Sequence, residues 1–448
     1  MRADVRLAWL LTRGSDRREW WRVTLTAIGA AFATGIGLAV AAIASMRGQY
    51  SVSVGAGLLD HPSDRQGVII TLLLLLVPVL GFLGQCARVG AVHRDRRLAA
   101  LRLAGATPRQ VRRIAALEAG PACLVGSAVA TVFSVLLMLR LWQHPEPLAW
   151  LGIALVAVAV PVLGTVVSAL SLRRVVASPL GWVRRVRPTR GPGRAFLAVT
   201  GLLTVTTLSL GLTTVFGNPL EFAFGPLAVF TLCLLTGVSA VWLAGWSSRR
   251  LGITLAARAQ RPALLIAAER LRDDPWAAAR THAAVLLVTV VGTAFVGIRA
   301  VLLHVVAHTE YLAENSSYYT TGLDLSGAAI LVALALTLSA LAVGTAESLA
   351  TRRRGLAAQA AAGVPQSVLG RALLLETALP LAPALLLAGA GGTAIYMGWA
   401  TMIDDAAGPL PLVPMLVPVA VYAVCLLAAA TSLPLLRRSV RPAELRYV

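Results

Sequence analysis

The sequence predicts an all-α, polytopic membrane protein. Of its 448 residues, 57% are hydrophobic and only 13% are charged, which lies far outside the range of soluble domains. Several apolar runs reach the roughly 20 residues that a helix needs to cross a bilayer. Basic residues cluster between these runs, so we interpret the net charge of +20 as orientation signals and contacts for lipid headgroups or a protein partner, not as a nucleic-acid surface.

About ten apolar segments are predicted to be membrane-spanning helices. Several contain proline or glycine, which membrane helices tolerate because neighbouring groups satisfy the freed backbone. The fifth segment is only moderately apolar because it is rich in threonine. In chain order the segments are 23–45, 67–87, 114–139, 148–171, 196–216, 225–245, 281–303, 325–346, 371–397 and 412–435.

Arginine placement predicts the orientation of these helices. All 40 basic residues are arginine. If the N-terminus is cytoplasmic, nearly all of them fall in cytoplasmic segments, as the positive-inside rule requires. The exceptions, at or near the outer side, are Arg47, Arg65, Arg140 and Arg299. We therefore expect both termini in the cytoplasm of a bacterium and the chain in its inner or plasma membrane.

One stretch of the chain occurs twice. Residues 96–118 read RRLAALRLAGATPRQVRRIAALE and residues 354–376 read RGLAAQAAAGVPQSVLGRALLLE, so that Gly105 matches Gly363. Each copy lies between the second and third spans of a group of four. Spans one to four and seven to ten are thus predicted to be two copies of one four-helix unit with short outer loops. Because two spans join them, the copies have the same orientation, unlike inverted repeats.

The repeat divides the chain into three predicted parts. They are a first four-helix repeat with an N-terminal amphipathic helix (1–190), a two-helix linker (191–255) and a second four-helix repeat (256–448).

On these motifs the chain resembles the FtsX-like permease family, the membrane subunits of ABC transporters of the MacB, LolE and BceB type. The most specific part is the first copy, with its arginine- and leucine-rich segment, Gly-Ala turn and following Glu. The resemblance implies that the repeated element docks on a separate ATPase, through 94–112 in the first unit and 352–370 in the second. One departure is that the outer connections, 46–66 and 304–324, are short where family members carry a large domain.

The ATPase-coupling residues implied by the resemblance lie in both copies. The first copy is richer in leucine and arginine, and the second is mostly alanine, so stronger packing is expected at the first. The predicted residues are Arg97, Leu98, Leu101, Arg102, Gly105, Ala106, Thr107, Pro108, Arg109, Gly363, Val364, Pro365 and Gln366.

The composition also bears on whether this chain itself could hydrolyse ATP. A Walker A motif needs its lysine to reach the phosphates, and this chain contains no lysine. We therefore expect no enzyme activity and no cofactor in this chain. ATP and Mg would be bound by two copies of a separate ATPase subunit.

Four other features carry less specific signals. Glu118 and Glu376 enter the inner ends of spans, where we favour a structural salt bridge to a nearby arginine, such as Arg113 or Arg371, over proton or substrate chemistry. His304 and His308 have a spacing that can bind zinc, but we interpret them as ordinary interface residues and predict no metal site.

Together these observations predict the membrane subunit of an ABC transporter that exports or extracts an amphipathic molecule. A lipid, a lipophilic drug and a membrane-active peptide are the candidate substrates. The alternative is a transmembrane signal relay driven by the same ATPase, against which the short outer loops count. An ion-coupled secondary transporter is disfavoured by the parallel repeat.

Overall fold

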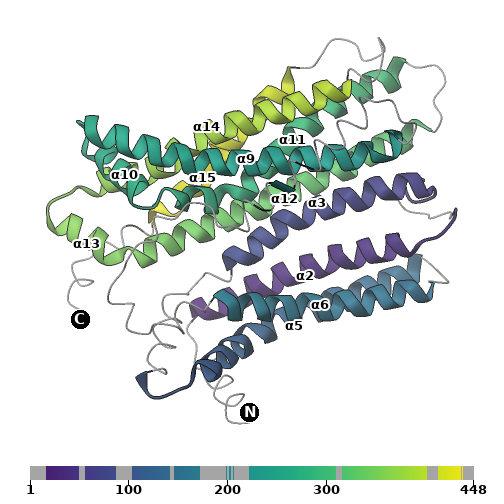
Figure 1. The fold of residues 1–448 in the computed structure, drawn as a ribbon, viewed down its shortest axis with the longest axis horizontal. Coiled ribbons are helices and arrows are strands. Elements are labelled where there is room, and N and C mark those ends of the chain that lie inside the picture. The colour runs from purple at the N-terminus through teal and green to yellow at the C-terminus, as the bar shows by residue number, and fades with distance from the viewer. Residues whose placement is uncertain are drawn as a thin grey trace. The chain divides into compact units, whose positions relative to one another are not determined.

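The computed structural model describes residues 17–49, 56–86, 103–141, 146–171, 221–308, 315–400 and 412–434, with a few isolated residues besides. These residues are almost entirely helical, and no strand occurs among them (Figure 1). In this described part, eight helices are long and apolar enough to cross a membrane. The predicted all-α, polytopic class is therefore confirmed.

Eight of the predicted spans coincide with these helices. A further one, 67–87, falls on α3 (Pro62–Cys86), a helix that is not among the eight. The span predicted at 196–216 lies almost entirely outside the described residues. The helices also run past the apolar segments into arginine-containing sequence: α9 ends at Arg258, well beyond the predicted end of its span at 245.

The chain divides into two compact units, Met1–Val186 and Arg187–Val448. In the first unit, α2 is central and packs against the other three helices. A Cβ at Gly126 of α5 would overlap the carbonyl oxygen of Ala27 in α2, so a side chain there would push the two backbones apart. The helices of this unit are α2 (Arg17–Ser45), α3, α5 (Pro108–Leu141) and α6 (Pro147–Ser171).

In the second unit, α11 and α14 form the most extensive helix contact, and α9 packs against both. Here a Cβ at Gly392 of α14 would lie only 2.6 Å from the carbonyl oxygen of Val290 in α11. The elements are α9 (Glu221–Arg258), α10 (Pro262–Asp273), α11 (Trp276–His308), α12 (Ser316–Thr351), α13 (Arg353–Ala361), α14 (Gln366–Ala400), the 3-10 helix η3 (Val413–Met415) and α15 (Leu416–Ala430).

The two units share the pairing of their first and third helices. The order α2, α3, α5, α6 corresponds to α11, α12, α14, α15, and in each unit the first and third helices make the largest contact. In each, a glycine of the third helix meets a backbone carbonyl of the first. A duplicated four-helix unit would have this arrangement. The finer division of the chain at 191–255 and 256–448 stays a prediction.

The close approach of α5 to α2 predicts a position-specific cost of adding one methyl group. Gly126→Ala should destabilise the first unit by about 1–3 kcal/mol, the usual cost of overpacking, and so lower the midpoint of thermal unfolding in detergent. The matched control is Gly35→Ala in α2, because a Cβ at Gly35 would meet nothing within 4 Å. Equal midpoints for the two variants would contradict the close contact.

Candidate coupling site

Both copies of the repeated motif contain the same tight turn before a long helix. Gly105 and Gly363 have φ angles of 97° and 89°, in the left-handed region where a side chain is strained. The turn leads into α5 at Pro108 in the first unit and into α14 at Gln366 in the second. The matched glycines therefore serve one conformational role.

In the second copy, hydrogen bonds close the end of α13 around Gly363. The Gly363 N–H donates to the carbonyl of Ala360 (2.9 Å), and the Val364 N–H donates to the carbonyl of Gln359 (3.1 Å). This pair of bonds is a Schellman motif, which requires a left-handed residue after the helix. The geometry explains why glycine occupies this position.

The first copy starts its long helix with a capping box. The Thr107 N–H donates to Gln110 Oε1 (2.8 Å), and the Gln110 N–H donates to Thr107 Oγ1 (3.3 Å). Pro108 takes the first helical position, where no N–H is needed. In the second copy Pro365 replaces the threonine, and its carbonyl accepts from the N–H groups of Val368 and Leu369. The displaced proline thus changes the cap while the turn remains.

The predicted coupling residues before Leu103 lie outside the described residues. They are Arg97, Leu98, Leu101 and Arg102. Of the residues that are described, Gly105 and Thr107 are exposed, as is Leu103 at 68%. A leucine so exposed beside the turn is available to a partner.

In the second copy, α13 buries one face and exposes the other. Leu356 is buried in a cluster with Leu349, Leu369 and Leu436, which we call the leucine cluster, and Val364 packs against it. The opposite surface consists of small or polar residues. Its exposed members are Gly355, Ala358, Ala361, Ala362, Gly363, Pro365, Gln366 and Ser367. The element is therefore anchored on one side and open on the other.

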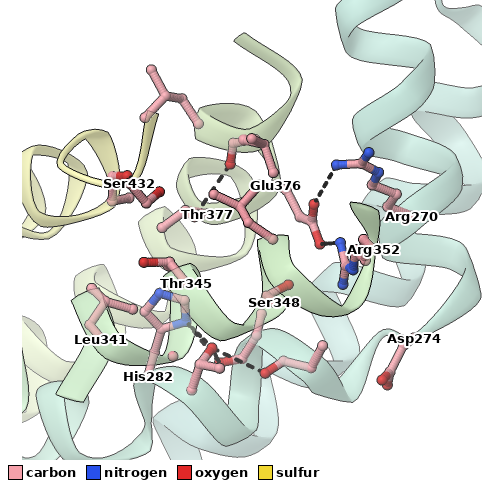
Figure 2. A pocket seen from close by; sticks show the side chains of 18 of the residues that line it. Arg270, Asp274, His282, Leu341, Thr345, Ser348, Arg352, Glu376, Thr377 and Ser432 are labelled. Atoms are coloured by element: carbon pink, nitrogen blue, oxygen red, sulfur yellow. Dashed lines mark hydrogen bonds and ion pairs between the residues drawn. The ribbon is translucent and has the colours of Figure 1, made fainter. Parts of the chain in front are cut away.

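Glu376 of α14 forms ion pairs that join three helices next to α13. Its Oε1 lies 2.6 Å from Arg352 Nη1, at the junction of α12 and α13, and its Oε2 lies 3.2 Å from Arg270 Nη1 of α10 (Figure 2). The Glu376 side chain is only 19% exposed. Such a partly buried carboxylate needs its cationic partners, because an unpaired one would be costly to desolvate.

Glu376 forms the predicted structural salt bridge, but not with Arg371, the example that the sequence suggested. The two residues lie five positions apart on α14, so their side chains point about 140° apart around the helix axis, and Arg371 is exposed. The observed partners come from α10 and from the end of α12. The equivalent prediction for Glu118 and Arg113 falls on side chains that the structure does not describe.

A cavity of about 90 Å³, lined by both polar and apolar side chains, adjoins the ion pairs. Hydroxyl groups of Thr345, Ser348 and Ser432 line it together with His282, which is buried (Figure 2). The His282 Nδ1–H donates to the carbonyl of Ala278 (2.8 Å), and Nε2 has no partner among the residues that the structure describes. A cavity of this size and polarity has room for water.

Sequence reasoning did not single out His282, Arg270 or Arg352. For His282 a signal exists, since an ionisable residue inside a predicted span is costly and uncommon. The two arginines resemble the many others that flank the spans, so no local signal distinguishes them.

The paired histidines near the other end of α11 contact each other. The rings of His304 and His308 lie 4.1 Å apart, and His308 Nδ1–H donates to the carbonyl of His304 (2.8 Å). In the part of the chain that the structure describes, no group of three or more His, Cys, Asp or Glu residues could hold a metal ion.

The ion pairs of Glu376 predict that removing its charge destabilises the protein more than removing the charge of Glu269, an exposed carboxylate on α10. Glu376→Gln leaves two arginines without their counterion, and breaking such a pair costs up to about 3–5 kcal/mol when it is fully buried, with a smaller value expected at this partly exposed site. The control is Glu269→Gln on α10, whose pair with Arg272 (3.5 Å) is exposed and should contribute about 0–1 kcal/mol. Thermal unfolding in detergent would measure both. An equal loss for the two variants would rule out the structural role of Glu376.

Comparison with known proteins links the first unit to a family. Residues 68–179 match the family described as FtsX-like permease C-terminal. The match covers most of α3 and all of the turn at Gly105, α5 and α6. No curated protein matches the chain. The MacB, LolE and BceB subtype stays a prediction. The resemblance to the FtsX-like permease family is therefore confirmed over residues 68–179 of the first unit.

Proposed function

We propose that this chain is the membrane-spanning permease subunit of an ABC transporter. ATP hydrolysis by a separate ATPase subunit would drive export or extraction of a lipid, a lipophilic drug or a membrane-active peptide. The observation that carries the proposal is the glycine turn that occurs once in each unit, exposed and joined directly to a long helix. The family match and the apolar helices support a membrane component of an ABC-type system.

The long helices suit the transmission of movement. α5 contains 34 residues and α14 contains 35. At 1.5 Å per residue each is about 50 Å long, against a hydrocarbon core of roughly 30 Å. Each helix therefore reaches from the turn across the membrane, so that a partner acting on the turn acts on the whole helix. The leucine cluster and the ion pairs of Glu376 bind the base of α14 to its neighbours.

We call each glycine turn, together with the segment before it, the coupling element. Its exposed surface suits a protein partner. Small side chains around Ala358 and Gly363 allow close backbone approach, and Leu103 offers apolar area in the first copy. Two copies of the element imply two copies of the ATPase. The chain has no lysine with which to build a Walker A motif, so hydrolysis belongs to the partner.

The orientation follows from the position of the arginines. α10 and α13 lie at the same end of the second unit (Figure 1), and both carry arginine. The positive-inside rule places this end in the cytoplasm, where an ATPase has access to it.

Transport is favoured over the alternative, a transmembrane signal relay driven by the same ATPase. A relay must grip a partner on the outer side. α11 ends at His308 and α12 begins at Ser316, so the connection between them is too short for a separate folded domain. The substrate is then expected to approach through the membrane or from a shallow outer vestibule.

The first test concerns coupling. An ATPase recovered with the tagged chain from native membranes should be lost with Ala358→Asp, because a charge would be desolvated in the interface. Leu103→Asp should cause a larger loss, since it also removes a leucine side chain worth about 1.5–3 kcal/mol when buried. The control is Ala257→Asp, at an exposed position near the end of α9. Recovery of the ATPase at wild-type level with both coupling variants would refute the docking role.

The second test concerns topology. In a background in which the four buried cysteines are replaced, single cysteines are placed at Ser367, beside the second turn, and at Ser316, at the start of α12; both positions are exposed. An impermeant maleimide added to intact cells should label the Ser316→Cys variant. It should label the Ser367→Cys variant only after the membrane is permeabilised. The opposite pattern would reverse the proposed orientation.

A further inference from the structure

A second pocket lies where α9 meets the α10–α11 junction, on residues that the coupling site does not use. Its volume is about 420 Å³. Three tryptophans and two arginines dominate the lining. They are Trp242, Trp246, Trp276, Arg249 and Arg272.

One wall of the pocket is a single exposed face of α9. Trp242, Trp246, Arg249 and Ile253 follow one another at spacings of four, three and four residues, which places them on the same side of a helix. Both indoles are exposed, at 47% and 44%, and their rings stack with centroids 6.4 Å apart. Large aromatic side chains on an open face are available for a ligand.

Two glycines fix the other wall. A Cβ at Gly245 would overlap the ring of Trp276, and a Cβ at Gly252 would lie 2.7 Å from the backbone nitrogen of Arg272. α9 can therefore approach the α10–α11 junction closely only because these positions lack side chains. The approach holds Trp276 and Arg272 beside the exposed face of α9, so the pocket is set by backbone packing.

The charge of the lining is positive. Among the described residues, the lining contains two arginines and no carboxylate. Arg249 makes no ion pair with any residue that the structure describes, and Arg272 makes a long ion pair with Glu269 (3.5 Å). The side chains of Arg272 and Glu269 are each at least half exposed. Arg250 adds a third guanidinium, 5.4 Å from the centre of the Trp246 ring. Guanidinium groups bind phosphate oxygens in pairs of hydrogen bonds, so the lining favours a phosphate.

The position of the pocket indicates what carries the phosphate. α9 includes the candidate membrane span Leu227–Arg258. Its apolar sequence gives way to Arg249 about 10 Å along the helix from Trp242, a distance comparable to the headgroup layer of a bilayer. Tryptophan favours this layer because its ring is apolar and its N–H is polar. We propose that this pocket binds one anionic phospholipid, with the phosphate between Arg249 and Arg272 and the glycerol and upper acyl chain against Trp242 and Trp246.

The experiment uses the full chain without any ATPase, so its outcome is independent of the proposed function. Tryptophan fluorescence is measured in phosphatidylcholine nanodiscs that contain a small fraction of brominated phosphatidylglycerol or brominated phosphatidylcholine. Wild type should be quenched preferentially by the brominated phosphatidylglycerol. Arg249→Ala/Arg272→Ala should weaken this preference about tenfold. Trp242→Phe/Trp246→Phe should remove most of the lipid-specific quenching.

The matched control is Arg258→Ala/Arg261→Ala, which removes two exposed arginines near the same end that do not line the pocket. It should keep the wild-type preference. If the alanine pair at 249 and 272 fails to fold, Arg249→Gln/Arg272→Gln replaces it. Equal quenching by the two lipids, an equal loss in the control, or full competition by soluble glycerol phosphate would each overturn the lipid site.

Discussion

Close backbone contact between the first and third helices is the constraint on which each unit depends. Lipid tails are as apolar as leucine, so helices in a membrane gain little by hiding apolar side chains from the solvent and must gain by packing closely. Gly126 against Ala27 and Gly392 against Val290 supply that contact. The core of the second unit is correspondingly rich in small residues, including Ala240, Ala384 and Ala388. Longer side chains at these positions would separate the helices.

The coupling element is built onto this contact. Its glycine turn leads directly into the third helix of each unit, the helix that makes the close backbone contact with the first. In the second unit, the leucine cluster holds the element from one side and the ion pairs of Glu376 hold α14 to α10 and α12. These contacts fix the base of α14 beside the exposed turn.

Much of this arrangement could be predicted because its causes are local in sequence. Hydropathy predicts the helices, and a glycine after a helix predicts the left-handed turn at Gly105 and Gly363. The partners of Glu376 could not be predicted, because they depend on how α10 and α12 pack around α14. Considering only the nearest arginine led to Arg371, which lies on another side of the helix. The cavity beside His282 could not be predicted for the same reason, because five separate helices contribute to its lining.

The prolines of α14 give this anchoring a mechanical consequence. Pro380 and Pro383 lie inside the helix, shortly after Glu376. A proline has no N–H, so the carbonyl of Glu376 lacks the donor that position 380 would otherwise provide. The base of α14 is thus held by the ion pairs of Glu376, and its backbone hydrogen bonds are interrupted one turn later. Under the proposed coupling, a push on the turn is therefore expected to bend α14 at this position rather than to move it as one rigid piece.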